Sequence, residues 1–576
     1  MKRAIPGDFP IWYDIGEYES DLNSALTELQ DIKAARRIWN RDGTLWQSTP
    51  QAVSDIENRL GWLDLPDAML VDVPRLQALA LEIRAAGITQ VVLLGMGGSS
   101  LAPEVMRRML GVLPGYPELT ILDSTDPAQI AHLLHRIPLP QTLFLVSSKS
   151  GTTSETMALF DFFRAAISEE VDAREWARHF VAITDPGTQL AKLAQESRFR
   201  SLYLNPPDIG GRYSALSLFG LVPAALIGQN LDNLLQSARA MAWECRAARP
   251  VRENSALILG AIMGELARHP TRRRDKLTIL TSAPLSPFTP WLEQLIAEST
   301  GKEGVGILPV EAESGEADFY GPDRLFVYLR LGTTDNEAND SLVSELIARG
   351  HPVVVLQIRE LHHLGAEFYR WEFATAIAGQ RLGINPFDQP NVESAKQRTK
   401  EALATYARQH ALPAPDPVLT ADVLSFYGPA FTANNAAAYL DAFLNQANPG
   451  DYVALLAFLE RNAANEALLR EMSQIIGQAM HAAVTIGFGP RFLHSTGQLH
   501  KGGPNTGLFI QITQDDSEEL PIPGHDYSFS VLKQAQALGD WQALQDANRR
   551  VIRVNIGHDV QAGLQELADA IRSALT

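Results

Sequence analysis

Short runs of β-branched and leucine residues alternate with segments of helical length along most of this 576-residue chain. The first group of runs lies at 90–94, 119–122, 143–147 and 180–184, and a small or polar residue follows each one. The runs are almost continuously apolar, without the polar alternation of a half-exposed strand. Such strands are buried on both faces by helices and belong to parallel sheets. The pattern therefore predicts an α/β fold with parallel sheets flanked by helices.

The same alternation returns twice, at 276–280, 325–329 and 352–356, and again at 508–513 and 551–556. The residues before the first run show helical patterns instead, at 22–39 and 52–60. At about 100–200 residues a domain, the length also favours several domains. We predict four parts, with boundaries as follows: a helical N-terminal extension (1–75), two α/β domains (76–250 and 251–414) and a C-terminal α/β unit (415–576).

Composition excludes several classes of protein. The chain has 67 acidic and 49 basic side chains and a formal net charge of −18, which argues against nucleic acid or an anionic membrane as its main partner. Its longest apolar stretch, 216–228, contains a proline and is shorter than the ~20 residues of a membrane span. The single cysteine, Cys245, excludes an intramolecular disulfide. With no targeting segment visible, we expect a cytoplasmic protein.

A glycine-rich loop, Gly95-Met96-Gly97-Gly98-Ser99-Ser100, follows the first apolar run and precedes a predicted helix. Small residues at that place let backbone N–H groups approach an anion, which the helix dipole also favours. The loop could instead be a plain turn between strand and helix. A dinucleotide fingerprint is a further alternative, but Ser100 stands where its third glycine belongs.

A second loop, residues 148–156 (SKSGTTSET), places six hydroxyl side chains and one lysine directly after an apolar run. Hydroxyls and backbone N–H groups at a helix start suit the acceptor oxygens of a phosphomonoester. The alternative is a capping turn, in which Thr153 and Thr156 satisfy free helix N–H groups. Capping needs only one or two hydroxyls, so the cluster favours a phosphate site.

Three charged side chains are candidates for chemistry. Arg212, beside two glycines, offers a planar pair of donors to a developing oxyanion, although it could instead cap a helix or bridge subunits. Glu298 shares a predicted helix face with Gln294, four residues earlier, although most glutamates are simply exposed. Lys396, at the start of another predicted helix, is unremarkable by itself.

Together these motifs resemble the glucose-6-phosphate isomerase family, within the superfamily of double sugar-isomerase (SIS) domains. Five stand in that family's order: GxGGSS at 95–100, SKSGTTSET at 148–156, GGRYS at 210–214, AESTGK at 297–302 and NPFDQPNVESAK at 385–396. Three more phrases are most similar to the isomerase half of transaldolase–isomerase fusion proteins: LW at 45–46, RLGWL at 59–63 and HSTGQLHKGGPN at 494–505. The two α/β domains would then be SIS domains.

The resemblance implies reversible isomerisation of glucose 6-phosphate and fructose 6-phosphate in glycolysis and gluconeogenesis, through ring opening and a cis-enediolate. It makes Glu298 the base between C2 and C1, Arg212 the partner of the enediolate and Lys396 an assistant in ring opening. The substrate is a small sugar phosphate, and no cofactor or metal takes part. The positions that match the family's sugar-phosphate site are Gly97, Ser99, Ser148, Ser150, Thr153 and Gln294.

The ring-opening histidine departs from the family's pattern, in which it lies between the glutamate and lysine motifs. That interval contains only three histidines, all of which look structural: His351, His362 and His363. The stretch 491–504 resembles the family's histidine loop, displaced along the chain. We therefore predict His494 as the ring-opening acid, with His500 as second choice, delivered within one chain or across the homodimer that the family suggests; a monomer is the alternative.

Other functions stay open at this point. The chain could be a non-catalytic sugar-phosphate sensor, but a sensor would need an output module, and none is visible in the sequence. It could be a related phosphosugar isomerase that also accepts mannose 6-phosphate. A nicotinamide-dependent dehydrogenase rests on the first glycine loop alone and fits poorly.

Overall fold

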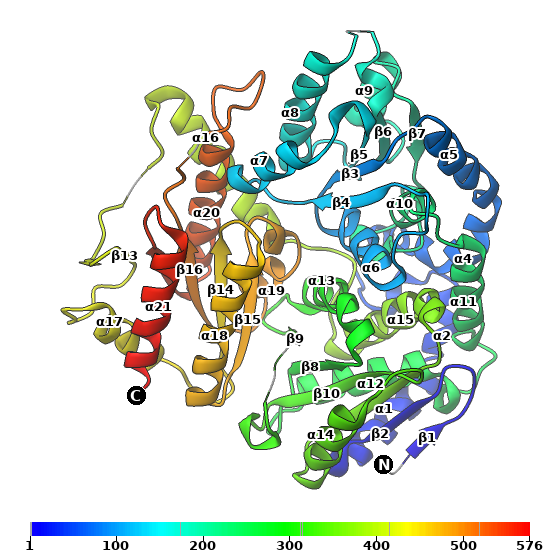
Figure 1. The fold of residues 1–576 in the computed structure, drawn as a ribbon. Helices are drawn as coiled ribbons and strands as arrows, with labels where there is room; N and C mark the ends of the chain where they lie inside the picture. The colour runs from blue at the N-terminus through cyan, green and yellow to red at the C-terminus, as the bar shows by residue number, and fades with distance from the viewer. Residues whose placement is uncertain (1–2, 173, 312, 314, 414, 518) are drawn as a thin grey trace.

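Three sheets, each with a parallel centre and covering helices, form the framework of the described residues in the computed structural model (Figure 1). The structure describes residues 3–172, 174–311, 313, 315–413, 415–517 and 519–576. The predicted α/β class is confirmed. Within this part of the chain, no helix is both long enough and apolar enough to cross a membrane.

The first sheet has the strand order β4-β3-β5-β6-β7, and all its neighbours are parallel. Its strands are β3 (Gln90–Gly95), β4 (Glu118–Leu122), β5 (Thr142–Ser147), β6 (Phe180–Thr184) and β7 (Ser201–Leu204). Its helices are α5 (Val73–Ala85), α6 (Leu101–Leu110), α7 (Pro127–Arg136), α8 (Ser154–Glu170), α9 (Gln189–Glu196), α10 (Leu218–Leu226) and α11 (Leu231–Glu244). The four predicted runs correspond to β3 to β6, whereas the short β7 is not among the predicted runs.

The second sheet has the order β1-β2-β11-β10-β8-β9. Its strands β8 (Lys276–Thr281), β9 (Leu308–Glu311), β10 (Arg324–Leu331) and β11 (Val353–Ile358) are parallel. Its helices are α12 (Ser255–Arg268), α13 (Thr289–Thr300), α14 (Glu337–Ala348) and α15 (Leu364–Leu382). The three predicted runs correspond to β8, β10 and β11.

The N-terminal residues are not the purely helical extension that the sequence predicts. They begin with β1 (Arg3–Ile5) and β2 (Ile11–Asp14), and β2 pairs antiparallel with β11 at the edge of the second sheet. The expected helix over 22–39 is divided into α1 (Glu19–Asp31) and α2 (Ala34–Trp39), because Lys33 between them is left-handed at φ 54°. Two helices follow, α3 (Pro50–Glu57) and α4 (Leu65–Ala68).

The third sheet has the order β12-β13-β17-β16-β14-β15 and fills the C-terminal unit, drawn from yellow to red in Figure 1. Its strands are β12 (Leu419–Ala421), β13 (Leu424–Tyr427), β14 (Tyr452–Phe458), β15 (Ala483–Phe488), β16 (Gly507–Thr513) and β17 (Arg550–Asn555). Its helices are α17 (Ala436–Leu444), α18 (Ala463–Met480), α19 (Gly497–Gly502), α20 (Phe529–Asp546) and α21 (Val560–Ala574). The apolar runs predict only β16 and β17 of these strands.

Apolar packing joins the parts of the chain. One core cluster extends from Phe9 to Phe387 and includes residues of the N-terminal part and of the first two sheets. The third unit has its own core around β14 and β16, but it also packs Phe529 against the first sheet and Leu499 against the second. Helix α16 (Val392–Gln409) lies beside α20 (Figure 1). These cores contain residues from both sides of the predicted domain boundaries, and the boundaries stay predictions.

The glycine loop after β3 contacts the 210–214 loop so closely that one position has no space for a side chain. A Cβ at Gly98 would overlap the carbonyl group of Gly211, whereas a Cβ at Gly211 would meet nothing within 4 Å. Gly98→Ala should therefore lower the free energy of unfolding by about 1–3 kcal/mol through overpacking. Gly211→Ala is the matched control and should stay close to the wild type. Chemical denaturation measures both, and equal stabilities would contradict the close contact.

Candidate active site

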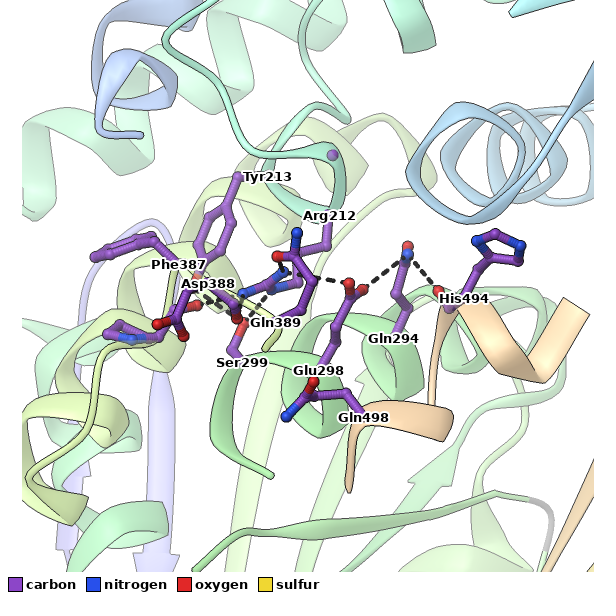
Figure 2. A network of polar contacts seen from close by, with 12 residues as sticks. Arg212, Tyr213, Gln294, Glu298, Ser299, Phe387, Asp388, Gln389, His494 and Gln498 are labelled. Atoms are coloured by element: carbon purple, nitrogen blue, oxygen red, sulfur yellow. Dashed lines mark hydrogen bonds and ion pairs between the residues drawn. The ribbon is translucent and has the colours of Figure 1, made fainter. Parts of the chain in front are cut away.

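The candidate site lies where the first sheet, helix α13 and the 491–496 loop of the third unit meet (Figure 2). Gly97, with φ +53°, is the point of contact. A Cβ at this position would lie 2.7 Å from Gln294 Nε2 and 3.1 Å from His494 Cβ. The glycine loop is therefore part of the site wall, and Ser99 beside it is buried.

Helix α13 presents Gln294 and Glu298 on one face, as the i, i+4 spacing predicts. Gln294 Nε2 donates to Glu298 Oε2 at 3.1 Å and to the backbone oxygen of His494 at 2.7 Å. The Gln294 side chain is buried, and 12% of the Glu298 side chain is exposed. One amide group thus connects the candidate base to the histidine loop.

Arg212 is buried and its guanidinium is held by several acceptors. It donates to Ser299 Oγ at 2.7 Å and to Gln389 Oε1 at 3.0 Å, and also to two backbone oxygens, of Pro386 at 2.7 Å and Asp388 at 2.9 Å. Its Nη1 lies 3.4 Å from Glu298 Oε1. The structure therefore brings these two predicted residues together, with the guanidinium held rigidly beside the carboxylate (Figure 2).

Lys302 is a buried cation that sequence reasoning missed, although it ends the motif at 297–302. Its Nζ donates to the backbone oxygen of Asp388 and to Asp388 Oδ1, the latter at 2.7 Å. Burial and the neighbouring Arg212 guanidinium lower its pKa to about 8. Lys302 and Arg212 thus hold the same 386–389 segment, and the only signal for this role was the family motif.

The hydroxyl-rich loop stands before helix α8. Ser148 Oγ and Thr153 Oγ1 are 2.9 Å apart, and Ser148 Oγ accepts from the N–H of Gly151 at 3.1 Å. Thr153 occupies the N-cap position, but its side chain makes no capping hydrogen bond. Ser150 Oγ accepts from the N–H of Thr152 at 3.3 Å. This arrangement counts against the capping alternative and leaves the start of α8 suited to an anion.

His494 is held by Glu155, a second residue that sequence reasoning missed. His494 Nε2 lies 3.0 Å from Glu155 Oε1, which also accepts from Gln536 Nε2 of α20 at 2.8 Å. Burial alone would raise the pKa of Glu155, but the charge and hydrogen bond of His494 outweigh it and lower this pKa to about 2. Glu155 lies in the 148–156 motif, and a carboxylate in the first turn of a buried helix is the signal that could have found it.

Two other predicted residues lie away from this network. Lys396 is half exposed on α16 and pairs with Glu393 at 2.8 Å; no contact in the described part of the chain joins it to Glu298. His500 is buried against the rings of Tyr452 and Phe509, and burial strongly lowers its pKa. Between the two candidate histidines, the structure brings only His494 to the other site residues.

No group of three or more potential metal-ligating side chains gathers among the residues that the structure describes. The arrangement instead offers a buried carboxylate beside a fixed guanidinium, an imidazole held by a second carboxylate, and two loops at strand ends suited to an anion. These are the groups that a phosphosugar isomerase uses for proton transfer through an enediolate. Fold and site together define that class of protein.

Comparison with known proteins identifies the family. The model of the family "Phosphoglucose isomerase" matches residues 82–322. The glucose-6-phosphate isomerase of Rubrobacter xylanophilus is 30% identical over 57% of this chain and 84% of its own length, and that of Acaryochloris marina is 32% identical over 66% and 77%. The chain belongs to the phosphoglucose isomerase family.

Two solved structures share the fold. A glucose-6-phosphate isomerase from Chlamydia trachomatis has the same fold, with a TM-score of 0.57 and 21% identity over 70% of this chain and 90% of that one. A hypothetical protein from Thermus thermophilus gives a TM-score of 0.56 and 26% identity, covering 68% of this chain and 100% of that one.

The ion pair between Glu155 and His494 should be visible in the pH dependence of stability. Since the pKa of Glu155 falls from 4.5 to about 2 in the folded state, its carboxylate stabilises the fold fully above pH 4.5, and this contribution disappears as the pH falls towards 2. Glu155→Gln should therefore cost roughly 2–3 kcal/mol at pH 6 and much less at pH 3.

Urea denaturation at the two pH values measures this difference. Glu170→Gln, at the exposed end of the same helix, is the control and should leave stability unchanged at both. A penalty for Glu155→Gln that is equal at pH 6 and pH 3 would contradict the depressed pKa.

Proposed function

We propose that Glu298, Arg212 and His494 carry out the reversible isomerisation of glucose 6-phosphate and fructose 6-phosphate, the activity of this family. The observation that carries the proposal is the buried pair of Glu298 and Arg212, 3.4 Å apart. Aldose–ketose isomerisation needs a base that moves a proton between C2 and C1 and a cation beside the enediolate oxygens. Since Arg212 is already held by neighbouring acceptors, it offers its charge with little reorganisation.

The two ends of the substrate would be held by different loops. The phosphate group would bind to Ser148, Ser150 and Thr153 at the start of α8, where hydroxyl and backbone donors gather. The sugar would extend towards Glu298 past Gly97 and Ser99. Gln294 holds one oxygen of Glu298 and leaves the carboxylate oriented for proton transfer.

His494 would protonate the ring oxygen during ring opening. Its Nε2 contacts Glu155, and its other ring nitrogen has no hydrogen-bond partner among the described residues. Imidazole is the side chain best suited to exchange protons near neutral pH. Lys396 has no place in this arrangement of one chain, so its assisting role remains a prediction of the family resemblance alone.

We also propose that one chain is the complete catalytic unit, whatever its state of association. His494 comes from the third unit, and it contacts Gln294 of the second domain and Glu155 of the first within the same chain. A cytoplasmic location in glycolysis and gluconeogenesis suits such an enzyme. Cys245 is fully buried, and the absence of a second cysteine suits a reducing compartment.

The role of Glu298 can be tested with a neutral replacement. Glu298→Gln should lower kcat by several orders of magnitude with little change in KM, because the charge is needed mainly in the transition state. A coupled assay that oxidises the glucose 6-phosphate formed from fructose 6-phosphate measures both constants. Glu303→Gln, at an exposed position five residues along, is the matched control. Near-normal turnover of Glu298→Gln would remove this carboxylate from the mechanism.

The one-chain site can be tested by mixing inactive variants. Chains with Glu298→Gln and chains with His494→Ala should not restore activity to each other after subunit exchange has been verified, because each site would lack one group. Recovered activity would mean that His494 acts across a subunit interface. His494→Ala should also lower the rate of isomerisation of the cyclic sugar far more than that of an open-chain substrate, since only ring opening needs the acid.

A further inference from the structure

A cavity of about 300 Å³ lies between the second domain and the third unit. Its wall includes Glu293 and Ser495 but not their neighbours Gln294 and His494, which belong to the catalytic network. The cavity runs along β15, whose residues 484–488 line it, and Arg461 and residues of α18 complete this wall.

Two carboxyl groups form one side of this cavity. Glu293 of α13 and Glu311 of β9 share a hydrogen bond, and their burial raises both pKa values, that of Glu293 to about 8. Ser495 Oγ donates to Glu293 Oε1 at 3.0 Å, and Thr289 Oγ1 donates to Glu311 Oε2 at 2.9 Å. A pair that holds a proton presents both a donor and acceptors to a hydroxyl group.

Thr485 of β15 supplies a second, independent observation. The residue is 7% exposed and lines the cavity, and its hydroxyl has no hydrogen-bond partner among the described residues. A buried polar atom without a partner is unfavourable unless water or a ligand satisfies it. Phe319, Phe488 and Phe492 add apolar rings to the same wall.

The charges of the cavity argue against an anion. The guanidinium of Arg491 donates to Asp123 at 2.8 Å and also contacts Glu104, and Arg461 donates to Glu466 at 2.8 Å. These two cations are therefore already neutralised, whereas Arg470, which also lines the cavity, lies at an exposed position of α18. Four carboxyl side chains also line the cavity: Glu293, Glu311, Glu313 and Glu466.

We propose that this cavity is a second binding site, for a neutral polyol of monosaccharide size. Hydroxyl groups would pair with Thr485 and the carboxyl pair, and the carbon face would pack against the phenylalanine rings. The site is separate from the one that holds the sugar phosphate and does not depend on the roles proposed for Glu298, Arg212 and His494.

Saturation-transfer NMR with glucose, fructose and sorbitol tests the proposal on the full chain. The measurement uses saturating fructose 6-phosphate, which occupies the catalytic site. At least one polyol should still bind, with a Kd in the millimolar range. Displacement of every polyol by fructose 6-phosphate, or no binding at all, would overturn the second site.

The variant Thr485→Val tests whether the polyol binds in this cavity. It keeps the shape of the side chain and removes the unpartnered hydroxyl, so it should fold and retain isomerase activity while weakening the polyol Kd about fivefold. Thr420→Val, at an exposed position of β12 in the same sheet, should bind as the wild type does. Unchanged binding by Thr485→Val in a folded, active protein would contradict this placement.

Discussion

The site depends on two glycine positions where three segments of backbone come together. Gly98 has no space for a Cβ against the backbone of Gly211, and at Gly97, where φ is +53°, a Cβ would crowd Gln294 Nε2 and His494. At this contact the glycine loop after β3 lies next to α13 and the histidine loop, which Gln294 joins through a hydrogen bond to the backbone oxygen of His494. A side chain there would separate Arg212 from the histidine loop before any catalytic group had changed.

Buried charges stabilise the site only because each has a partner. Arg212 and Lys302 both donate to the 386–389 segment, and Glu298 lies against Arg212. Glu155 is matched by His494 and Gln536. An isolated charge in such surroundings would be costly, whereas groups paired in this way are also fixed in position, which proton transfer requires. The same contacts therefore stabilise the buried charges and hold them in position for proton transfer.

Much of the fold and of the site follows from local sequence. Continuous apolar runs identify most central strands of the first two sheets, since burial on both faces leaves a local pattern. The i, i+4 spacing of Gln294 and Glu298 is also local. The N-terminal strands do not follow from local sequence, because β2 pairs with β11, far away in the sequence, and among the described strands β1 pairs only with β2. The strand β14 is also fully apolar, although it is not among the predicted runs.

Local sequence patterns do not reveal contacts between residues that are far apart in the chain. His494 and Glu155 are 339 positions apart, so neither motif reveals that one holds the other. The same applies to Lys302, whose partner Asp388 is 86 positions away. His494 and His500 stand in one motif, and only packing distinguishes the histidine at the site from the one among aromatic rings.

The covalent connection between the third unit and the rest of the chain has a consequence for how the enzyme behaves on dilution. A group supplied by a separate molecule is lost from a site when the protein concentration falls below the dissociation constant of the assembly. A group supplied through the chain has an effective concentration set by geometry alone, which dilution does not change. If His494 acts within its own chain, as we propose, the activity of each molecule is independent of how many others surround it.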